Sequence, residues 1–227
     1  MLFRSRKLGQ VSVDAPRAFS VRGVFSENFQ RVLEKIVRRR GGFLQIGRHA
    51  LHALRRVVEL LRAAGGRPCF VGGCVRDALM GVPVTDFDLE VYGLGTRAIE
   101  AALRREFGIV TVGAAFGVTK LKDLPVDVSV PRRENRTGVK HTDFEVQADP
   151  TMTPKDAAER RDFTLNAILW DPATGELIDP WGGRADLAAK VLRHVSPKFA
   201  EDPLRVLRAM QDRKSTRLNS SHIPLSR

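Results

Sequence analysis

Hydrophobic side chains recur at helical spacing just after residue 50, where the regular pattern of this chain begins. They lie three or four residues apart, which places them on one face of a helix. This face consists of Leu51, Leu54, Val57, Val58 and Leu61. Gly65-Gly66 can end the helix, and the apolar run over residues 68–71 predicts a buried strand next.

Short helices and strands then alternate as far as residue 130. Gly72-Gly73 turns the chain into a helix predicted over residues 74–80. A second helix is predicted over residues 96–107. Strands are predicted over residues 87–92 and near 109–112, 116–121 and 125–130.

Beyond residue 130 the pattern predicts an irregular segment, then mostly helices. Residues 131–150 are polar and have no regular period, so we expect an irregular loop there. Thr153-Pro154 is a typical helix start, which predicts a helix over 154–167, and a hairpin follows over 168–178. Asp202-Pro203 opens a final helix. The pattern predicts an α/β (α+β) head with a mixed sheet flanked by helices, followed by the start of an all-helical neck domain.

The basic excess of the chain is concentrated at its two ends. The 227 residues carry 38 Lys and Arg against 26 Asp and Glu, a net charge of +12. Residues 1–48 hold 11 of the basic side chains against 3 acidic ones, and residues 212–227 hold 4 against 1. A basic arm attracts phosphates nonspecifically, but we favour solvated segments at both ends. The Ser/Arg-rich residues 212–227 have no apolar stripe, and we interpret them as foreign sequence or as a natural disordered tail.

Composition also argues against a membrane or secreted protein. No apolar run is long enough to cross a bilayer, and Met1 to Gln10 lacks the apolar stretch of a secretory signal. Cys69 and Cys74 are too few for a disulfide framework, and no histidine has zinc-ligand spacing with them. We therefore expect a cytoplasmic protein with reduced cysteines and no membrane partner.

Asp86-Phe87-Asp88 is the first candidate for chemistry. Residues i and i+2 of a strand point to the same side, so Asp86 and Asp88 present two carboxylates together while Phe87 turns to the core. Two close carboxylates are costly unless a cation lies between them, and hard oxygen ligands favour Mg²⁺, with Mn²⁺ as a substitute. Alone, such a pair is more often a polar strand edge.

Gly72-Gly73 precedes this pair and can hold phosphates. Glycines let the backbone approach an anion closely, and free N–H groups at a helix start can donate to it. Arg76 lies in the first turn of the same predicted helix, within reach of a phosphate. A Gly-Gly pair alone is usually only a turn, but followed by the Asp-x-Asp strand it predicts a site for a metal-bound nucleoside triphosphate.

A known family has similar residues in the same order. Gly72-Gly73-Cys74-Val75-Arg76-Asp77 followed by Asp86-Phe87-Asp88 resembles the first motif of the class II tRNA nucleotidyltransferases and bacterial poly(A) polymerases, within the polymerase β-like superfamily. The resemblance covers about residues 49–211. The further motifs are Arg160-Arg161-Asp162-Phe163-Thr164-Leu165-Asn166-Ala167, then Asp179-Pro180-Trp181-Gly182-Gly183 with Asp186-Leu187, and Glu201-Asp202-Pro203-Leu204-Arg205-Val206-Leu207-Arg208.

The resemblance implies a third catalytic carboxylate, and Asp127 matches its place. From the residues alone, the favoured interpretation of Asp127 is an ordinary solvent-facing acid of a strand whose valines face the other way, and only the resemblance favours a metal ligand. The family implies that Asp86, Asp88 and Asp127 hold two Mg²⁺ ions, which activate the RNA 3′-hydroxyl and stabilise the pyrophosphate leaving group.

The second motif of the family implies contacts to the nucleotide. Arg160 and Arg161 are expected to touch the nucleotide or its phosphates, and the alternative is surface charge on the predicted 154–167 helix. Asp162 and Asn166 are four residues apart, hence on one face of that helix. They bind the ribose or brace the site, and the sequence does not separate these roles.

The neck motif implies selection of the base. A carboxylate and a guanidinium three residues apart share a helical face, so Asp202 and Arg205 can read the Watson–Crick edge of C or A. The alternative is structural: Asp202 caps the helix before Pro203, and Arg205 makes a surface ion pair.

The expected function is template-independent addition of CMP and AMP, from CTP and ATP, to the 3′ end of tRNA. A poly(A) polymerase, or an enzyme adding only CC or only A, is the nearest alternative, and a truncated nucleotide-binding fragment without activity is an alternative of another class. We expect a catalytic head over residues 49–195, a neck start over 196–211, a poorly ordered basic extension over 1–48 and a non-family tail over 212–227. The oligomeric state is left open.

Overall fold

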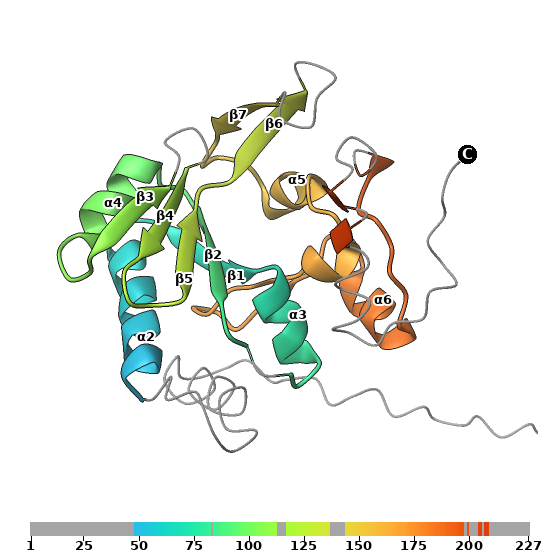
Figure 1. The fold of residues 1–227 in the computed structure, drawn as a ribbon, viewed down its shortest axis with the longest axis horizontal. Coiled ribbons are helices and arrows are strands. Elements are labelled where there is room, and N and C mark those ends of the chain that lie inside the picture. Colours follow the sequence, from blue (N-terminus) through green and yellow to red (C-terminus); the bar gives the residue numbers. More distant parts are fainter. Residues whose placement is uncertain are drawn as a thin grey trace, which may run out of the picture.

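The computed structural model describes residues 48–82, 84–112, 117–136 and 144–197, with residues 199, 204, 205, 207 and 208. In this part of the chain, helices pack against a seven-stranded sheet (Figure 1). Residues 1–47 of the expected basic extension, the expected tail over 212–227 and Asp202 lie outside the described residues.

Helices and strands alternate as the sequence pattern predicts. Their order is α2 (Arg48–Ala63), β1 (Arg67–Val71), α3 (Gly73–Leu79), β2 (Phe87–Tyr92), α4 (Thr96–Leu103), β3 (Ile109–Val112), β4 (Val118–Leu121), β5 (Val126–Ser129), β6 (Arg132–Arg136), β7 (Phe144–Ala148), α5 (Pro154–Glu159), the 3₁₀ helix η1 (Thr164–Asn166), β8 (Leu169–Trp170), β9 (Leu177–Ile178) and α6 (Gly183–Ala189).

The main sheet is mixed, which confirms the predicted fold class. Its strand order is β3-β4-β5-β2-β1-β8-β9. Strands β2 and β5 pair in parallel, whereas the other neighbours in the sheet are antiparallel. The parallel pair lies in the middle of the sheet, so both strands are fixed by a neighbour on each side.

The larger hydrophobic core lies between one face of this sheet and helices α2 and α4. The apolar stripe predicted for α2 is buried there, with Leu54, Val57, Val58 and Leu61 at most 1% exposed. Phe87, Leu89 and Val91 of β2 enter the same core, as do Val126 and Val128 of β5. Because side chains alternate along a strand, Asp88 and Asp127 belong to the opposite face of the sheet.

A smaller apolar cluster covers part of that opposite face. It contains Cys69, Val71, Tyr92, Met152, Ala157 and Leu169, and it joins α5 to the sheet. Cys69 and Cys74 are both buried and free, as the composition predicts. Burial raises the pKa of each thiol to about 12, so both remain protonated packing residues at neutral pH.

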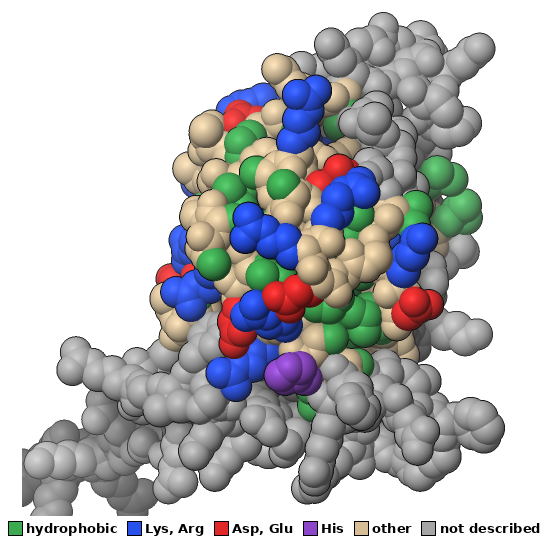
Figure 2. Space-filling model, turned by 90° about the vertical axis from the view of Figure 1, so that its left-hand side faces the viewer, with side chains coloured by type: hydrophobic (Ala, Val, Ile, Leu, Met, Phe, Trp, Pro, Cys, Tyr) green, Lys and Arg blue, Asp and Glu red, His purple; other side chains and the backbone are tan. Residues whose placement is uncertain are grey.

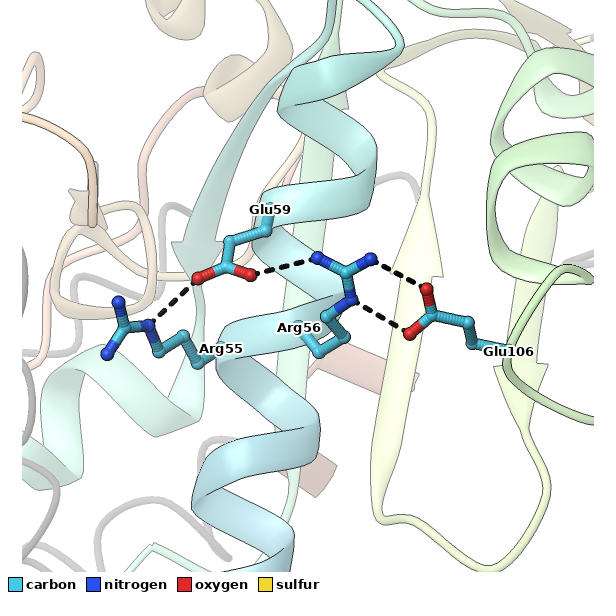
Figure 3. Close-up of polar contacts among 4 residues, drawn as sticks. All are labelled: Arg55, Arg56, Glu59 and Glu106. Carbon is cyan, nitrogen blue, oxygen red and sulfur yellow. Dashed lines mark hydrogen bonds and ion pairs between the residues drawn. The ribbon is translucent and has the colours of Figure 1, made fainter.

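Arginine–carboxylate pairs tie α2 to the chain that follows α4. Arg56 donates from Nε and Nη2 to the two carboxylate oxygens of Glu106, at 2.8 and 2.7 Å (Figure 3). Glu59 accepts from both Arg55 and Arg56 on the same helix face. These side chains are partly exposed, so the contacts fix the orientation of α2 more than they stabilise the fold.

The expectation of an irregular loop over residues 131–150 is wrong. Strands β6 and β7 form an antiparallel hairpin there, with Arg132 opposite Ala148 and Arg136 opposite Phe144. The hairpin is a separate two-stranded sheet beside the main one (Figure 1). A ribbon of this kind is held mainly by backbone hydrogen bonds, so it needs no apolar alternation that a sequence could show.

The predicted helix over residues 154–167 is also wrong in its length. It begins as expected, because the Thr153 hydroxyl accepts from the backbone N–H of Asp156 and Pro154 follows the cap. It ends at Glu159, since Phe163 is extended and pairs with His194 in an isolated bridge. The helix predicted over 96–107 likewise ends early, at Leu103.

Surface charge is mixed in the described part of the chain. On the face shown in Figure 2, basic side chains are interspersed with acidic and apolar ones and form no continuous basic surface. Among the described residues, no helix combines the length and apolar character needed to span a bilayer.

Candidate active site

Asp88 and Asp127 lie side by side on the parallel strands β2 and β5. The pairing register places Asp88 directly opposite Asp127 and Phe87 opposite Val126. Both carboxylates therefore project from the same face of the sheet, away from the main core. The structure thus brings together two of the three acids that the sequence analysis selected.

Asp86 stands just before β2, two residues from Asp88. Its Oδ2 atom accepts a hydrogen bond of 2.7 Å from the Thr85 hydroxyl. Surrounding protein desolvates the carboxyl group of Asp88 and raises its pKa; Arg161 opposes this, and the charges of Asp127 and Asp86 raise the pKa further. Asp86 and Asp127 therefore both act electrostatically on Asp88.

These acids lie near one another but do not form a complete metal-binding site. Within the described ranges, no group of three Asp, Glu, His or Cys side chains is close enough to count as a metal site. The donor set nevertheless fits a hard divalent cation, because it consists of carboxylates and because the strand register places two of them side by side.

Lys120 is a functional candidate that the sequence analysis missed. It lies on β4 opposite Asp127, and its ammonium group donates to Asp127 Oδ2 at 2.7 Å. A lone lysine on a short strand gives no signal in the sequence. It is recognised here only because the register of β4 places it beside the acids.

The Gly72-Gly73 turn lies next to these acids. Gly72 precedes α3 with φ +75° and ψ −141°, a conformation essentially restricted to glycine. A Cβ atom on Gly72 would lie 3.5 Å from Arg161 Nη1 and 3.6 Å from Asp88 Oδ2. The position of a Cβ on Gly72 is therefore close to both a cation and a site carboxylate.

Arg76 connects this turn to the second motif by a hydrogen bond. Its guanidinium lies beside Gly73 and donates from Nε to Asp77 and from Nη1 to Asn166 Oδ1, both at 2.8 Å. Asn166 in turn donates to Asp162 Oδ1 at 3.1 Å. Asp162 and Asn166 were predicted to share one face of a helix. The two side chains are in contact, but a turn and the 3₁₀ helix η1 bring them together in place of that helix.

Glu90 is a second residue that the sequence analysis missed. It is fully buried on β2, and its Oε1 atom lies 3.0 Å from Arg160 Nη2 and 3.5 Å from Arg161 Nη2. Tyr92 donates its hydroxyl to the other oxygen at 2.8 Å. Burial alone would raise the pKa of Glu90, but the two arginines and these hydrogen bonds outweigh it and lower the pKa.

Arg160 and Arg161 are therefore not surface charges. Their side chains are only 19% and 16% exposed. Burial is the largest single influence and lowers the pKa of Arg161, but the combined charges around it, Glu90 first among them, outweigh it. The pKa is therefore raised overall and the guanidinium stays charged. A fixed cation thus lies between the buried Glu90 and the Gly72 turn.

The acids of the third motif make structural contacts. Asp179 accepts from the backbone N–H groups of Gly183 and Arg184, at 2.7 and 3.0 Å, and so caps α6. Asp186 is buried and accepts from the Thr164 hydroxyl at 2.7 Å. These contacts hold α6 against η1 and thereby support the second motif.

Part of the neck motif reaches the second motif. Arg205 is buried, and Arg208 Nε lies 3.8 Å from Asp162 Oδ2. Asp202 lies outside the described residues, so its expected pairing with Arg205 in base selection remains a prediction.

Comparison with known families agrees with this arrangement. Residues 69–193 match the family described as the Poly A polymerase head domain. The chain belongs to this family. The match contains the glycine turn, the three acids and the second motif, so it confirms the resemblance noted in the sequence for a poly(A) polymerase-type head.

Curated relatives of this head domain carry a common name. The Multifunctional CCA protein of Xylella fastidiosa (strain M23) is 47% identical over 139 residues, covering 61% of this chain and 32% of that protein. The protein of the same name from Vibrio cholerae serotype O1 (strain ATCC 39541 / Classical Ogawa 395 / O395) is 47% identical over 138 residues, covering 61% and 33%. The chain thus spans about a third of the length of these relatives.

Solved structures of CCA-adding enzymes share the fold. The Bacillus stearothermophilus enzyme in complex with CTP matches with a TM-score of 0.59 and 27% identity, covering 74% of this chain and 40% of that chain. The Thermotoga maritima enzyme complexed with tRNA matches with a TM-score of 0.61 and 26% identity, covering 83% and 42%.

Proposed function

We propose that this protein transfers CMP and AMP from CTP and ATP to the 3′ end of tRNA. The observation that carries the proposal is the register of β2 and β5, which pairs Asp88 with Asp127 beside the Gly72 turn. Further support comes from the solved relatives, whose structures include complexes with CTP, with ATP and with tRNA.

The three acids are proposed to hold two divalent ions, Mg²⁺ or Mn²⁺. Bound ions would lower the pKa of the RNA 3′-hydroxyl and stabilise the pyrophosphate leaving group. Asp88 and Asp127 would both hold the ions, because they are register partners, and Asp86 would complete the set from just before β2.

The residues around the glycine turn are proposed to hold the nucleotide. Backbone N–H groups of Gly72 and Gly73 would donate to the triphosphate, with Arg161 neutralising charge beside them. Arg76 and Arg160 add positive charge nearby, while the Asn166–Asp162 pair binds the ribose or braces Arg76. Asp202 and Arg205 are proposed to select the base.

A variant at the glycine turn tests the phosphate site. We expect Gly72→Ala to lower the free energy of unfolding by about 1–3 kcal/mol, because φ +75° strains any other residue, and to weaken CTP binding. Gly65→Ala is the matched control, since Gly65 also has a positive φ but has nothing within 4 Å of the added Cβ. Equal CTP affinity of the two variants, measured by titration calorimetry, would argue against phosphate binding at this turn.

The proposed function is tested by incorporation of single labelled nucleotides. The protein is incubated with Mg²⁺, a tRNA lacking its 3′ CCA and each of the four nucleoside triphosphates. Two C additions followed by one A, with no further growth, support the proposal. Long A tracts support a poly(A) polymerase, and C alone or A alone supports a partial enzyme. Nucleotide binding without incorporation into any RNA would contradict the activity for this chain.

A further inference from the structure

The ammonium group of Lys120 occupies a special place in the carboxylate cluster. Strands β4 and β5 are antiparallel, and their register sets Lys120 opposite Asp127. The hydrogen bond from Nζ to Asp127 Oδ2 is 2.7 Å long, a length typical of a charge-assisted pair. The Lys120 side chain is 49% exposed, so it has room to move away.

All three acids of the site act on this one ammonium group. Its hydrogen bond with Asp127 and the charge of Asp127 raise the pKa of Lys120, and the charges of Asp88 and Asp86 raise it further. Arg161 Nη1 and Asp88 Oδ2 both lie beside Gly72. The acids are thus bordered by a movable cation at Asp127 and a buried one near Asp88.

We propose that Lys120 holds Asp127 until a divalent ion arrives, and that it couples metal binding to nucleotide binding. This inference rests on the proposed function of the same three acids. A divalent ion at Asp127 repels the ammonium group and competes with it for the same carboxylate, so the ion binds weakly while Lys120 stays. A triphosphate offers the displaced ammonium a new anionic partner, and the flexible lysine stem can follow it.

The inference is tested by Mn²⁺ titration followed by electron paramagnetic resonance, without nucleotide and then with CTP. We expect Lys120→Met to bind Mn²⁺ roughly fivefold more tightly than the wild type without nucleotide, the scale of one partly exposed ion pair. With CTP present, the advantage should disappear. Lys122→Met removes an equal charge two residues away and should behave like the wild type, as should Lys120→Arg, which keeps the cation.

Asp127→Asn separates the failure of this inference from the failure of the metal site. If Asp127→Asn weakens Mn²⁺ binding but Lys120→Met binds Mn²⁺ like the wild type, the role of Lys120 is overturned and the metal site stands. If Asp127→Asn leaves Mn²⁺ binding unchanged, Asp127 is no ligand, and both ideas fall. Tighter binding by Lys120→Met and by Lys122→Met alike would show only a general charge effect and would also overturn the inference.

Discussion

Replacing Asp88 with asparagine is expected to lower the rate of nucleotide addition by about a thousandfold or more. Metal ions stabilise transition-state charge by several kcal/mol, and each step of about 1.4 kcal/mol is worth a factor of ten in rate. Asparagine keeps the shape of Asp88 but loses the charge that holds the ion. The measurement is the single-turnover rate of labelled CMP incorporation, together with Mn²⁺-dependent CTP binding.

The same substitution is expected to stabilise the fold at neutral pH. The pKa of Asp88 is raised in the folded protein, mainly by desolvation, so its charged form costs stability above that pKa. Removing the charge should therefore raise the melting temperature at pH 7. The gain in melting temperature should shrink as the pH falls towards 3.8, the ordinary pKa of an aspartate. A variant that loses activity through misfolding would show the opposite change in melting temperature.

Asp123→Asn is the matched control for Asp88. Asp123 is exposed in the turn between β4 and β5, and its positive φ of 62° suits asparagine. We expect it to change neither the rate nor CTP binding. An Asp88→Asn variant as active as Asp123→Asn would contradict a catalytic role for the β2–β5 acids.

The second large effect is expected at Glu90. We expect Glu90→Ala to lower the free energy of unfolding by about 3–5 kcal/mol, because it leaves Arg160 and Arg161 buried without their shared carboxylate. The measurement is urea unfolding followed by circular dichroism. Nucleotide binding should weaken as well, since Glu90 fixes the position of both arginines.

Two comparisons show whether burial causes this effect. Glu106→Ala removes one of the two carboxylate partners of Arg56 at a partly exposed position and should change stability little (Figure 3). Unfolding measured as a function of pH is the second comparison. The pKa of Glu90 is lowered in the folded protein, so Glu90 stabilises the fold fully above pH 4.5, the ordinary pKa of a glutamate. This stabilisation is lost as the pH falls through the lowered pKa. A loss at Glu90 no larger than that at Glu106 would show that the buried pair is unimportant.

The sequence predicted the parts of the site that depend on strand alternation. Phe87 and the valines beside Asp127 form an apolar pattern with period two, so the pattern alone indicates which way Asp88 and Asp127 point. Neighbouring strands were not predictable from the pattern, so the family resemblance was needed to place Asp127 beside Asp88.

Residues whose role depends on tertiary contacts escaped the sequence analysis. Glu90 lies two residues after Asp88 on β2, so the alternation of side chains places both on the same face of the sheet. The sequence does not show that Arg160 and Arg161, about 70 residues later, neutralise Glu90. Lys120 becomes significant only through the register of β4 with β5. The 154–167 region was predicted as one helix, but the helix ends at Glu159 and Phe163 pairs with His194 in a bridge, a tertiary contact that the pattern does not show.

The central claim is that the three acids hold divalent ions beside a triphosphate on the glycine turn. Anomalous diffraction from crystals grown with Mn²⁺ and a non-hydrolysable CTP analogue tests it most directly. We expect manganese peaks within coordination distance of Asp88 and Asp127, and the triphosphate against Gly72 and Gly73. Manganese bound elsewhere, or a triphosphate remote from that turn, would contradict the claim.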